Sequence, residues 1–162
     1  MSVETDLIPV AINLILAAAT VVAVFYAYKT VQSNQKSLEA QFLYDLFKEY
    51  STQDMGEHVR ILRNFKRVHP DVGKAYKEQY REGNDLDLAR RDVSHYYQRI
   101  ARLREGGYVS ELFIKTVVTS ENTDFLQHTI IPIEKVHAET IGTQPFNEQV
   151  FDCLFQIVGP KK

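Results

Sequence analysis

Hydrophobic and polar residues divide the first third of the chain into two segments. Residues 7–28 form a nearly uncharged apolar run, and residues 29–52 are charged and amphipathic. Neither glycine nor proline occurs from Val10 to Met55, so no residue that commonly breaks a helix lies there. We therefore predict a short tail over 1–6, a transmembrane helix over 7–28 and a stalk helix over 29–52 that joins a soluble body.

Apolar residues recur in the stalk at the three- and four-residue spacing of an amphipathic helix. These residues are Val31, Leu38, Phe42, Leu43, Leu46, Phe47 and Tyr50. The rest of the chain repeats this spacing and has no run of alternating polar and apolar residues. The predicted fold is all-α, with one N-terminal transmembrane helix that continues into a multi-helix bundle over 53–158, followed by a short tail over 159–162.

The helices of the bundle have recognisable starts and stops. Three of them are predicted over about 53–68, 71–80 and 86–105. Further helices are expected after the capping residues Ser110, Ser120 and Thr143. Pro132 is expected to kink the helix that follows Ser120, because proline has no N–H group for the carbonyl four residues earlier.

Charges beside the apolar run indicate its direction across a membrane. No Lys or Arg precedes the run, whereas Lys29 and Lys36 follow it. The positive-inside rule then predicts an outside N-terminus and a cytoplasmic body. Glu4 and Asp6 lie where a cleaved signal peptide would carry basic residues, which favours a retained anchor.

Small residues form a candidate packing face in the transmembrane helix. Ala19, Ala23 and Ala27 lie one above another at four-residue spacing, and this arrangement lets a second helix approach closely. Asn13 could hydrogen-bond to such a helix. The alternative is that alanine is merely common in spans and that Asn13 reaches towards the near interface.

Aromatic residues mark the C-terminal end of the apolar run. Phe25, Tyr26 and Tyr28 are predicted to form an interfacial belt, because aromatic rings favour the level of the lipid headgroups.

The net charge of −2 conceals an uneven distribution. Residues 1–52 carry a net charge of −2, residues 53–104 carry +4 and residues 105–162 carry −4. A bipolar body favours docking or self-association over binding to nucleic acid, which prefers a clearly basic domain. No nucleic-acid partner is therefore expected.

A basic stripe lies on the predicted helix over 53–68. It consists of Arg60, Arg63, Lys66 and Arg67, and Arg91, Arg99 and Arg102 extend the basic character to a later helix. Beside an inner leaflet these residues could contact anionic headgroups, or they could contact a protein partner. The alternative is an ordinary solvated face that is paired with nearby Asp and Glu.

Chemical motifs are scarce. Glu134 and His137 have the spacing of half a di-iron carboxylate site, but no second Glu-x-x-His accompanies them, so a solvated pair is the stronger interpretation. Cys153 is the only cysteine and lies among apolar residues, which predicts a buried, inert thiol. No phosphate loop or nucleophile elbow occurs, so neither a catalytic residue nor a metal or cofactor site is predicted.

One stretch carries a resemblance to known proteins. The residues Tyr96-Tyr97-Gln98-Arg99-Ile100-Ala101-Arg102-Leu103-Arg104-Glu105-Gly106-Gly107, and later Ile131-Pro132-Ile133, resemble a group of bacterial single-span membrane proteins with a helical domain of unknown function. The resemblance covers about residues 20–158, and Gln98 stands where the group has Glu. It implies a bacterial inner-membrane protein of this architecture and adds no chemistry.

These observations favour a membrane-anchored, non-enzymatic accessory or scaffolding subunit of a larger membrane assembly. Its expected partners are the lipid bilayer and a membrane protein or further copies of the chain. The alternative is a regulatory or defence-type sensor that binds anionic lipid or a ligand through its basic helices. An enzyme whose site leaves no sequence motif is a third hypothesis.

Overall fold

The computed structural model describes residues 4–159, and within its first helix it describes the side chains of Ile12 and of residues 15–50. The described part is helical and contains no β-strand, as predicted. It divides into two compact units, Met1–Ala40 and Gln41–Lys162, which are described separately.

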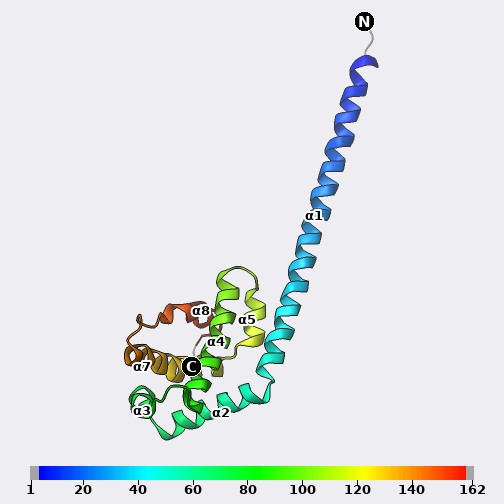
Figure 1. Cartoon of the computed structure of the whole chain (residues 1–162). Helices are drawn as coiled ribbons and strands as arrows, with labels where there is room; N and C mark the ends of the chain where they lie inside the picture. Colours follow the sequence, from blue (N-terminus) through cyan, green and yellow to red (C-terminus); the bar gives the residue numbers. More distant parts are fainter. Residues whose placement is uncertain (1–3, 160–162) are drawn as a thin grey trace. The chain divides into compact units, whose positions relative to one another are not determined.

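The first unit holds the part of helix α1 that precedes Gln41, and the full bounds of this helix are Glu4–Tyr50 (Figure 1). The helix begins three residues before the predicted start at residue 7 and ends two residues before the predicted end at residue 52. Among the described residues, one helix is long and apolar enough to cross a membrane, and it is α1 from Ile15 to Tyr50. No residue in the most apolar 18-residue stretch of this helix is buried. Signal sequences pass the same test of length and composition, so α1 is a candidate span.

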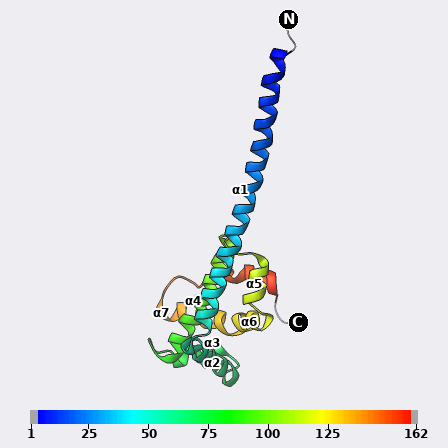
Figure 2. The ribbon, with the colours of Figure 1, turned by 90° about the vertical axis from the view of Figure 1, so that its right-hand side faces the viewer.

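Helix α4 (Asp85–Glu105) forms the centre of the second unit (Figure 2). The elements that pack against it include α2 (Gln53–Val68), α5 (Glu111–Val117), η2 (Glu148–Phe151) and α8 (Asp152–Val158). Its core face includes Ala89, Val93 and Ile100, which have no exposed surface. Burial of a side chain as large as that of Val93 or Ile100 contributes about 1.5–3 kcal/mol.

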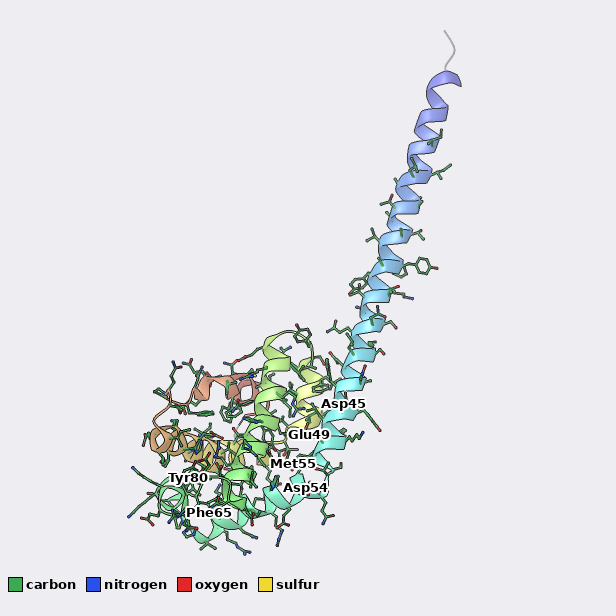
Figure 3. The ribbon with its side chains drawn as sticks, viewed as in Figure 1. Asp45, Glu49, Asp54, Met55, Phe65 and Tyr80 are labelled. Carbon is green, nitrogen blue, oxygen red and sulfur yellow. The ribbon has the colours of Figure 1, made fainter. Side chains whose placement is uncertain are left out.

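The last turns of α1 belong to this second unit. Leu46 is buried, and the ring of Tyr50 lies 5.4 Å from that of Tyr96 on α4, measured between centroids. Figure 3 shows Glu49 on the same turns, and its carboxylate accepts a 2.6 Å hydrogen bond from Arg99 of α4. The compact unit therefore starts at Gln41, within the predicted stalk.

Helix α3 (Val72–Gln79) packs mainly against α7 (Ile131–Ile141). Gly73 lies at this contact, where an added Cβ would come within 3.2 Å of a methyl carbon of Val136. The close approach of α3 and α7 brings polar side chains of the two helices together.

Side-chain caps fix most helix starts. Helix α2 begins and ends where the sequence predicts, and Thr52 caps it by accepting the Met55 N–H. Helix α6 (Ser120–Phe125) is capped by Thr119, one residue before the predicted Ser120. Thr119 is the cap because Thr119 and Asn122 form a reciprocal capping box, in which each side chain accepts the other's backbone N–H.

The chain widens into a π-turn before Pro132. The π-helical segment η1 (Leu126–Ile130) joins α6 to α7, and the Ile131 N–H donates to the Leu126 carbonyl five residues earlier. Pro132 lies in the first turn of α7, directly after η1, and cannot donate to a carbonyl of the preceding turn. The irregularity expected from Pro132 therefore takes the form of a π-turn in the residues just before it.

The prediction that Thr143 starts the last helix is wrong. Gly142 adopts the left-handed conformation with φ of 68° and ends α7, and the Thr143 N–H donates to the Ala138 carbonyl. Thr143 therefore belongs to the end of α7. Asn147 caps the next element, η2, by accepting the Gln149 N–H.

Candidate functional site

Three charged side chains are buried between α4 and α7. Arg90 lies between two carboxylates: it donates to Asp87 through Nε and Nη2, at 3.2 and 2.9 Å, and to both oxygens of Glu134 through Nη1, at 2.9 and 3.0 Å. Each of the three residues is at most 7% exposed. The cluster carries two negative charges for one positive charge, so it retains a net charge of −1.

Tyr76 and His137 extend this cluster. The Tyr76 hydroxyl lies 3.3 Å from Asp87 Oδ1 and 3.2 Å from His137 Nδ1. An ionised carboxylate only accepts, and a hydroxyl has a single proton to donate. Tyr76 therefore donates to Asp87 and accepts from His137, which assigns the imidazole proton to Nδ1. Together, Tyr76, Asp87, Arg90, Glu134 and His137 are called the buried network below.

Local structure at the start of α4 positions Asp87. Asn84 caps the helix by accepting the Asp87 N–H at 2.8 Å, and Asp87 Oδ2 accepts the Gly83 N–H at 3.1 Å. Gly83 adopts a left-handed backbone with φ of 73°, which favours glycine at this turn. Arg90 lies three residues after Asp87 on the same helical face, so the turn also positions the guanidinium.

Burial and charge shift the pKa values of the network in opposing ways. Burial acts to raise the pKa of Asp87, but hydrogen bonds from Arg90 and Gly83 outweigh it and hold this pKa below its usual value. Burial, reinforced by the charge of Arg90, lowers the pKa of His137. Burial raises the pKa of Tyr76, so its hydroxyl stays protonated and remains a donor. At neutral pH the network thus holds two carboxylates, one guanidinium and a neutral imidazole.

The network opens into a hollow of about 620 Å³. Arg90 and Glu134 form part of its lining, α4 contributes Gln98 and Arg102, and the segment between α7 and η2 contributes Gln144 and Asn147. Its volume lies within the range of small-molecule sites, about 300–1,000 Å³. Because amide and charged groups line it, the hollow suits a polar ligand. We call it the polar hollow.

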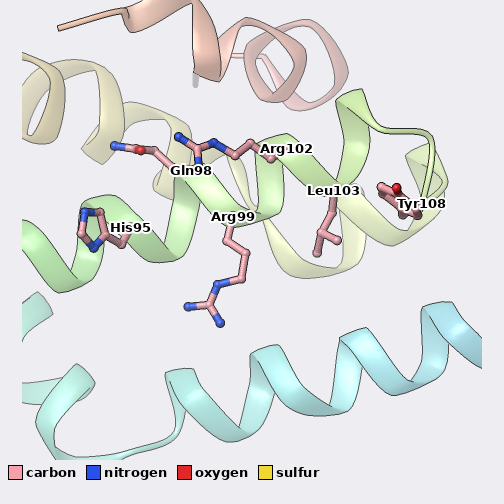
Figure 4. Close-up of a pocket in the computed structure, with 6 residues that line it drawn as sticks. All are labelled: His95, Gln98, Arg99, Arg102, Leu103 and Tyr108. Atoms are coloured by element: carbon pink, nitrogen blue, oxygen red, sulfur yellow. The ribbon is translucent and has the colours of Figure 1, made fainter.

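A second hollow of about 470 Å³ adjoins it and shares His95, Gln98 and Arg102 with it. Figure 4 shows Arg99 on the side of α4 that faces α1, whereas Gln98 and Arg102 extend from the other side. Arg99 pairs with Glu49. Arg102 has neither an ion pair nor a hydrogen bond among the described residues, so its five N–H groups are available to a ligand.

The interpretation of Glu134 and His137 as a solvated pair is wrong. Glu134 is buried against Arg90, and His137 is bonded to Tyr76. The described residues contain no group of three or more His, Cys, Asp or Glu that could hold a metal ion. The half-motif is therefore part of an ionic and hydrogen-bonded network.

Sequence reasoning did not find Asp87, Arg90 or Tyr76. A signal was present, because Arg90 lies four residues after Leu86 and three before Val93, within the apolar stripe of α4. A charged residue on a buried helical face needs a partner, and this need points to an acidic residue on a facing helix.

The predicted packing face of α1 is accessible. Ala19, Ala23 and Ala27 are exposed on α1, whereas the Asn13 side chain lies outside the described residues. Exposure is what a packing face requires before a second helix binds. The packing role itself stays a prediction.

The predicted aromatic belt is also exposed. Phe25 and Tyr26 meet edge to face with ring centroids 6.2 Å apart, and Lys29 Nζ lies 5.3 Å from the Phe25 ring centroid. Gln32 donates a 2.7 Å hydrogen bond to the Tyr28 hydroxyl. The cluster thus combines apolar rings with polar groups, the composition that suits a membrane–water interface.

The basic stripe on α2 is largely paired with acidic residues. The pairs are Arg60 with Glu57, Arg63 with Glu121 and Lys66 with Asp124, whereas Arg67 has no ion pair within the described chain. The pairing of Arg63 and Lys66 joins α2 to α6. The alternative interpretation, a solvated face paired with acidic residues, predicts this arrangement. The pairing leaves less positive charge free to contact lipid headgroups or a protein partner.

Cys153 lies partly buried, with Sγ 3.7 Å from the Ala101 carbonyl oxygen. Burial raises the pKa of the thiol, which lowers its reactivity.

No family model, curated protein or solved structure matches the chain.

Proposed function

We propose that the protein is a membrane-anchored, non-enzymatic accessory or scaffolding subunit of a larger membrane protein assembly. One observation carries the proposal: the large apolar side chains that the structure describes in the apolar run of α1 are exposed. Ile15, Val21 and Val24 are each more than 60% exposed. In water this surface would be unfavourable, at about 25 cal/mol per Å² of apolar area. A bilayer or a partner helix removes that cost.

The flanking residues support an anchor of defined direction. Lys29 and Lys36 follow the apolar run, and the belt of Phe25, Tyr26 and Tyr28 lies just before them. We propose that the N-terminus lies outside and that the second unit lies in the cytoplasm of a bacterium, following the positive-inside rule.

Membrane fractionation tests the anchor. The full chain should remain in the membrane pellet after an alkaline carbonate wash and should be released by detergent. Replacing Leu16 and Val21 with Asp should move it to the supernatant, because acidic residues near the centre of a span each cost about 2.5–3.5 kcal/mol on insertion scales. The matched control Leu16→Ile/Val21→Leu should stay in the pellet. A mature chain that lacks the apolar run, found by intact mass, would show a cleaved signal sequence and contradict the anchor.

Native mass spectrometry after gentle detergent extraction tests the accessory role. We expect a stoichiometric membrane partner or a homo-oligomer that depends on the alanine face. Ala23→Leu should reduce co-purification, because added bulk separates the helices. Ala17→Leu adds the same bulk on another face of the helix, two residues before Ala19, and should leave the assembly intact. Recovery of monomer alone from the unmodified chain would contradict the proposal.

A further inference from the structure

The α4–α5 loop, residues 106–110, and the first turn of α5 expose large apolar side chains. Tyr108 is 60% exposed and Leu112 is 75% exposed, which is more than Ile15 or Val21 in the apolar run, at 68% and 69%. We infer that this loop is a second membrane contact, at which Tyr108 and Leu112 enter the headgroup region of an anionic bilayer. The inference rests on the proposed anchor and adds to it a surface of the second unit.

Backbone geometry holds the loop in a fixed form. Gly107 adopts the left-handed conformation with φ of 72°, and the Tyr108 N–H donates to the Leu103 carbonyl at 3.0 Å. These are features of the Schellman motif that commonly ends a helix. The Tyr108 ring lies against Gly106, because a Cβ added at Gly106 would come within 2.5 Å of the ring atom Cε2. The turn thus leaves the tyrosine at the surface.

The residues that follow the tyrosine tie the loop to the core. Val109 is buried, and its carbonyl accepts a 3.1 Å hydrogen bond from Arg104. Ser110 caps α5 by accepting the Phe113 N–H at 3.2 Å. Because Phe113 is buried, its neighbour Leu112 lies on the outer side of α5. The structure of the loop therefore enforces the exposure of both apolar side chains.

The loop lies at the end of the second unit where α1 enters it. The rings of Tyr50 and Tyr96 meet, and Glu49, one residue earlier on α1, pairs with Arg99, three residues later on α4. The two helices therefore run in opposite directions past this contact, as Figure 4 shows. Gln41 lies nine residues before Tyr50, and α4 ends nine residues after Tyr96, so each end is about 14 Å from the contact.

The chain between the anchor and the second unit is short. Thirteen residues lead from Tyr28 in the aromatic belt to Gln41, and as α-helix they span about 20 Å. The headgroup region covers about 5–8 Å of this length. A tilt of α1 by about 20–40° would shorten the remaining distance. Because the anchor keeps the loop near the bilayer, a contact that is weak for a free protein becomes intramolecular.

The charge around the loop complements an anionic surface. Residues 102–116 carry three basic and two acidic side chains, a net charge of +1. Glu111 has an ion pair with an arginine of α4, which leaves Glu105 against Arg102 and Lys115. Both of these cations are exposed, with neither an ion pair nor a hydrogen bond among the described residues. Cations beside exposed aromatic and aliphatic side chains suit an interfacial contact with anionic lipid.

Fluorescence quenching by lipid tests the inference on the full chain in vesicles of phosphatidylcholine and phosphatidylglycerol. In a Cys153→Ser background, Thr116→Cys, Val68→Cys or Phe25→Cys carries an environment-sensitive nitrobenzoxadiazole label. Thr116 is exposed one turn after Leu112, whereas Val68 ends α2, at the other end of the unit from the loop (Figure 1). Lipids that carry a nitroxide near the headgroup quench labels that lie at the bilayer surface.

We expect the labels at positions 116 and 25 to lose most of their fluorescence and the label at 68 to lose little. If the label at 25 is quenched but the label at 116 is not, the inference is wrong and the proposed anchor is still supported. If neither label is quenched, the anchor is contradicted as well. Equal quenching at 116 and 68 would show a contact that does not depend on the loop and would overturn the inference.

Serine substitutions identify the apolar side chains responsible. Tyr108→Ser/Leu112→Ser should restore most of the fluorescence at position 116. The matched control Tyr44→Ser/Val68→Ser removes a tyrosine and an aliphatic side chain that are similarly exposed, at 68% and 64%, and should leave the quenching unchanged. Equal thermal unfolding curves will show that both variants fold. Quenching that persists in Tyr108→Ser/Leu112→Ser would overturn the assignment.

The lipid charge provides the last arm of the test. Quenching at position 116 should weaken in vesicles of phosphatidylcholine alone, at high salt, and in Arg102→Gln/Lys115→Gln, because each change removes attraction between cations and anionic headgroups. Quenching that ignores all three changes would contradict a contact with anionic lipid.

Discussion

Replacement of Arg90 by methionine is the sharpest test of the buried network. Methionine fills similar volume but leaves Asp87 and Glu134 buried without their shared counter-ion. Removing one partner of a buried ionic cluster costs about 3–5 kcal/mol. For a unit of this size that loss lowers the unfolding temperature by about 10–20 °C.

The assay is urea unfolding in detergent, followed by near-UV circular dichroism of the buried tyrosines, since the chain has no tryptophan. Arg91→Met is the matched control: Arg91 is the next residue, is half exposed and has only a 3.7 Å contact with Asp92. It should change the unfolding free energy by less than about 0.5 kcal/mol. The double variant Arg90→Met/Glu134→Leu should lose less unfolding free energy than the two single variants lose in sum, because it leaves one fewer unpaired carboxylate.

A pH series supplies a second check on the same variant. Without the hydrogen bonds from Arg90, burial should raise the pKa of Asp87, so at this group the folded variant binds more protons than its unfolded chain does. Its deficit in stability relative to the unmodified protein should therefore shrink as pH falls towards about 4. The reasoning would be refuted if Arg90→Met lost less than about 1 kcal/mol of unfolding free energy at neutral pH. It would also be refuted if the difference in stability between the variant and the unmodified protein did not change with pH.

Three further predictions concern the unmodified network and its surroundings. The unfolding free energy should fall as pH drops below 6.5, because the lowered pKa of His137 means that the unfolded chain takes up the proton first. Urea titrations at several pH values measure this dependence of the unfolding free energy on pH. The dependence should largely vanish in His137→Gln. The lowered pKa of Asp87 adds a second loss below pH 3.8. Asn84→Ala should cost about 1 kcal/mol by removing the cap of α4, whereas Asn84→Asp, which keeps an acceptor, should cost much less; equal losses would argue against the cap. Cys153 should react with iodoacetamide far more slowly in the folded protein than in urea, because burial raises the pKa of its thiol. Mass spectrometry of the alkylated fraction over time measures the two rates. Equal rates would contradict the burial of Cys153.

Much of the fold follows from local patterns in the sequence. The bounds of α2 coincide with the prediction because Thr52 and the charges at its ends are local signals. The start of α6 and the path after α7 were not predicted correctly, since Thr119 competes with Ser120 as a cap and Gly142 ends α7 just before Thr143. These competitions are decided by backbone hydrogen bonds that a residue pattern does not specify.

Local patterns in the sequence could not predict the buried network, because its members are distant in sequence. Arg90 and Glu134 are 44 residues apart, and Tyr76 and His137 are 61 apart. Only the packing of α3, α4 and α7 brings them together. Arg90 alone gave a usable signal, as a charged residue within an apolar stripe.

The π-turn before Pro132 has a consequence for how this part of the chain can change in sequence. A π-turn holds one residue more than an α-turn, and each residue advances an α-helix by about 100°. Because the wider turn absorbs the extra residue, deleting one residue from Leu126–Ile130 would restore regular winding and leave α7 facing in nearly the same direction. Glu134 would then still meet Arg90, whereas a deletion between Ile131 and Glu134 would turn Glu134 by about 100°. Homologues should therefore tolerate a difference of one residue in the length of Leu126–Ile130 and keep the network.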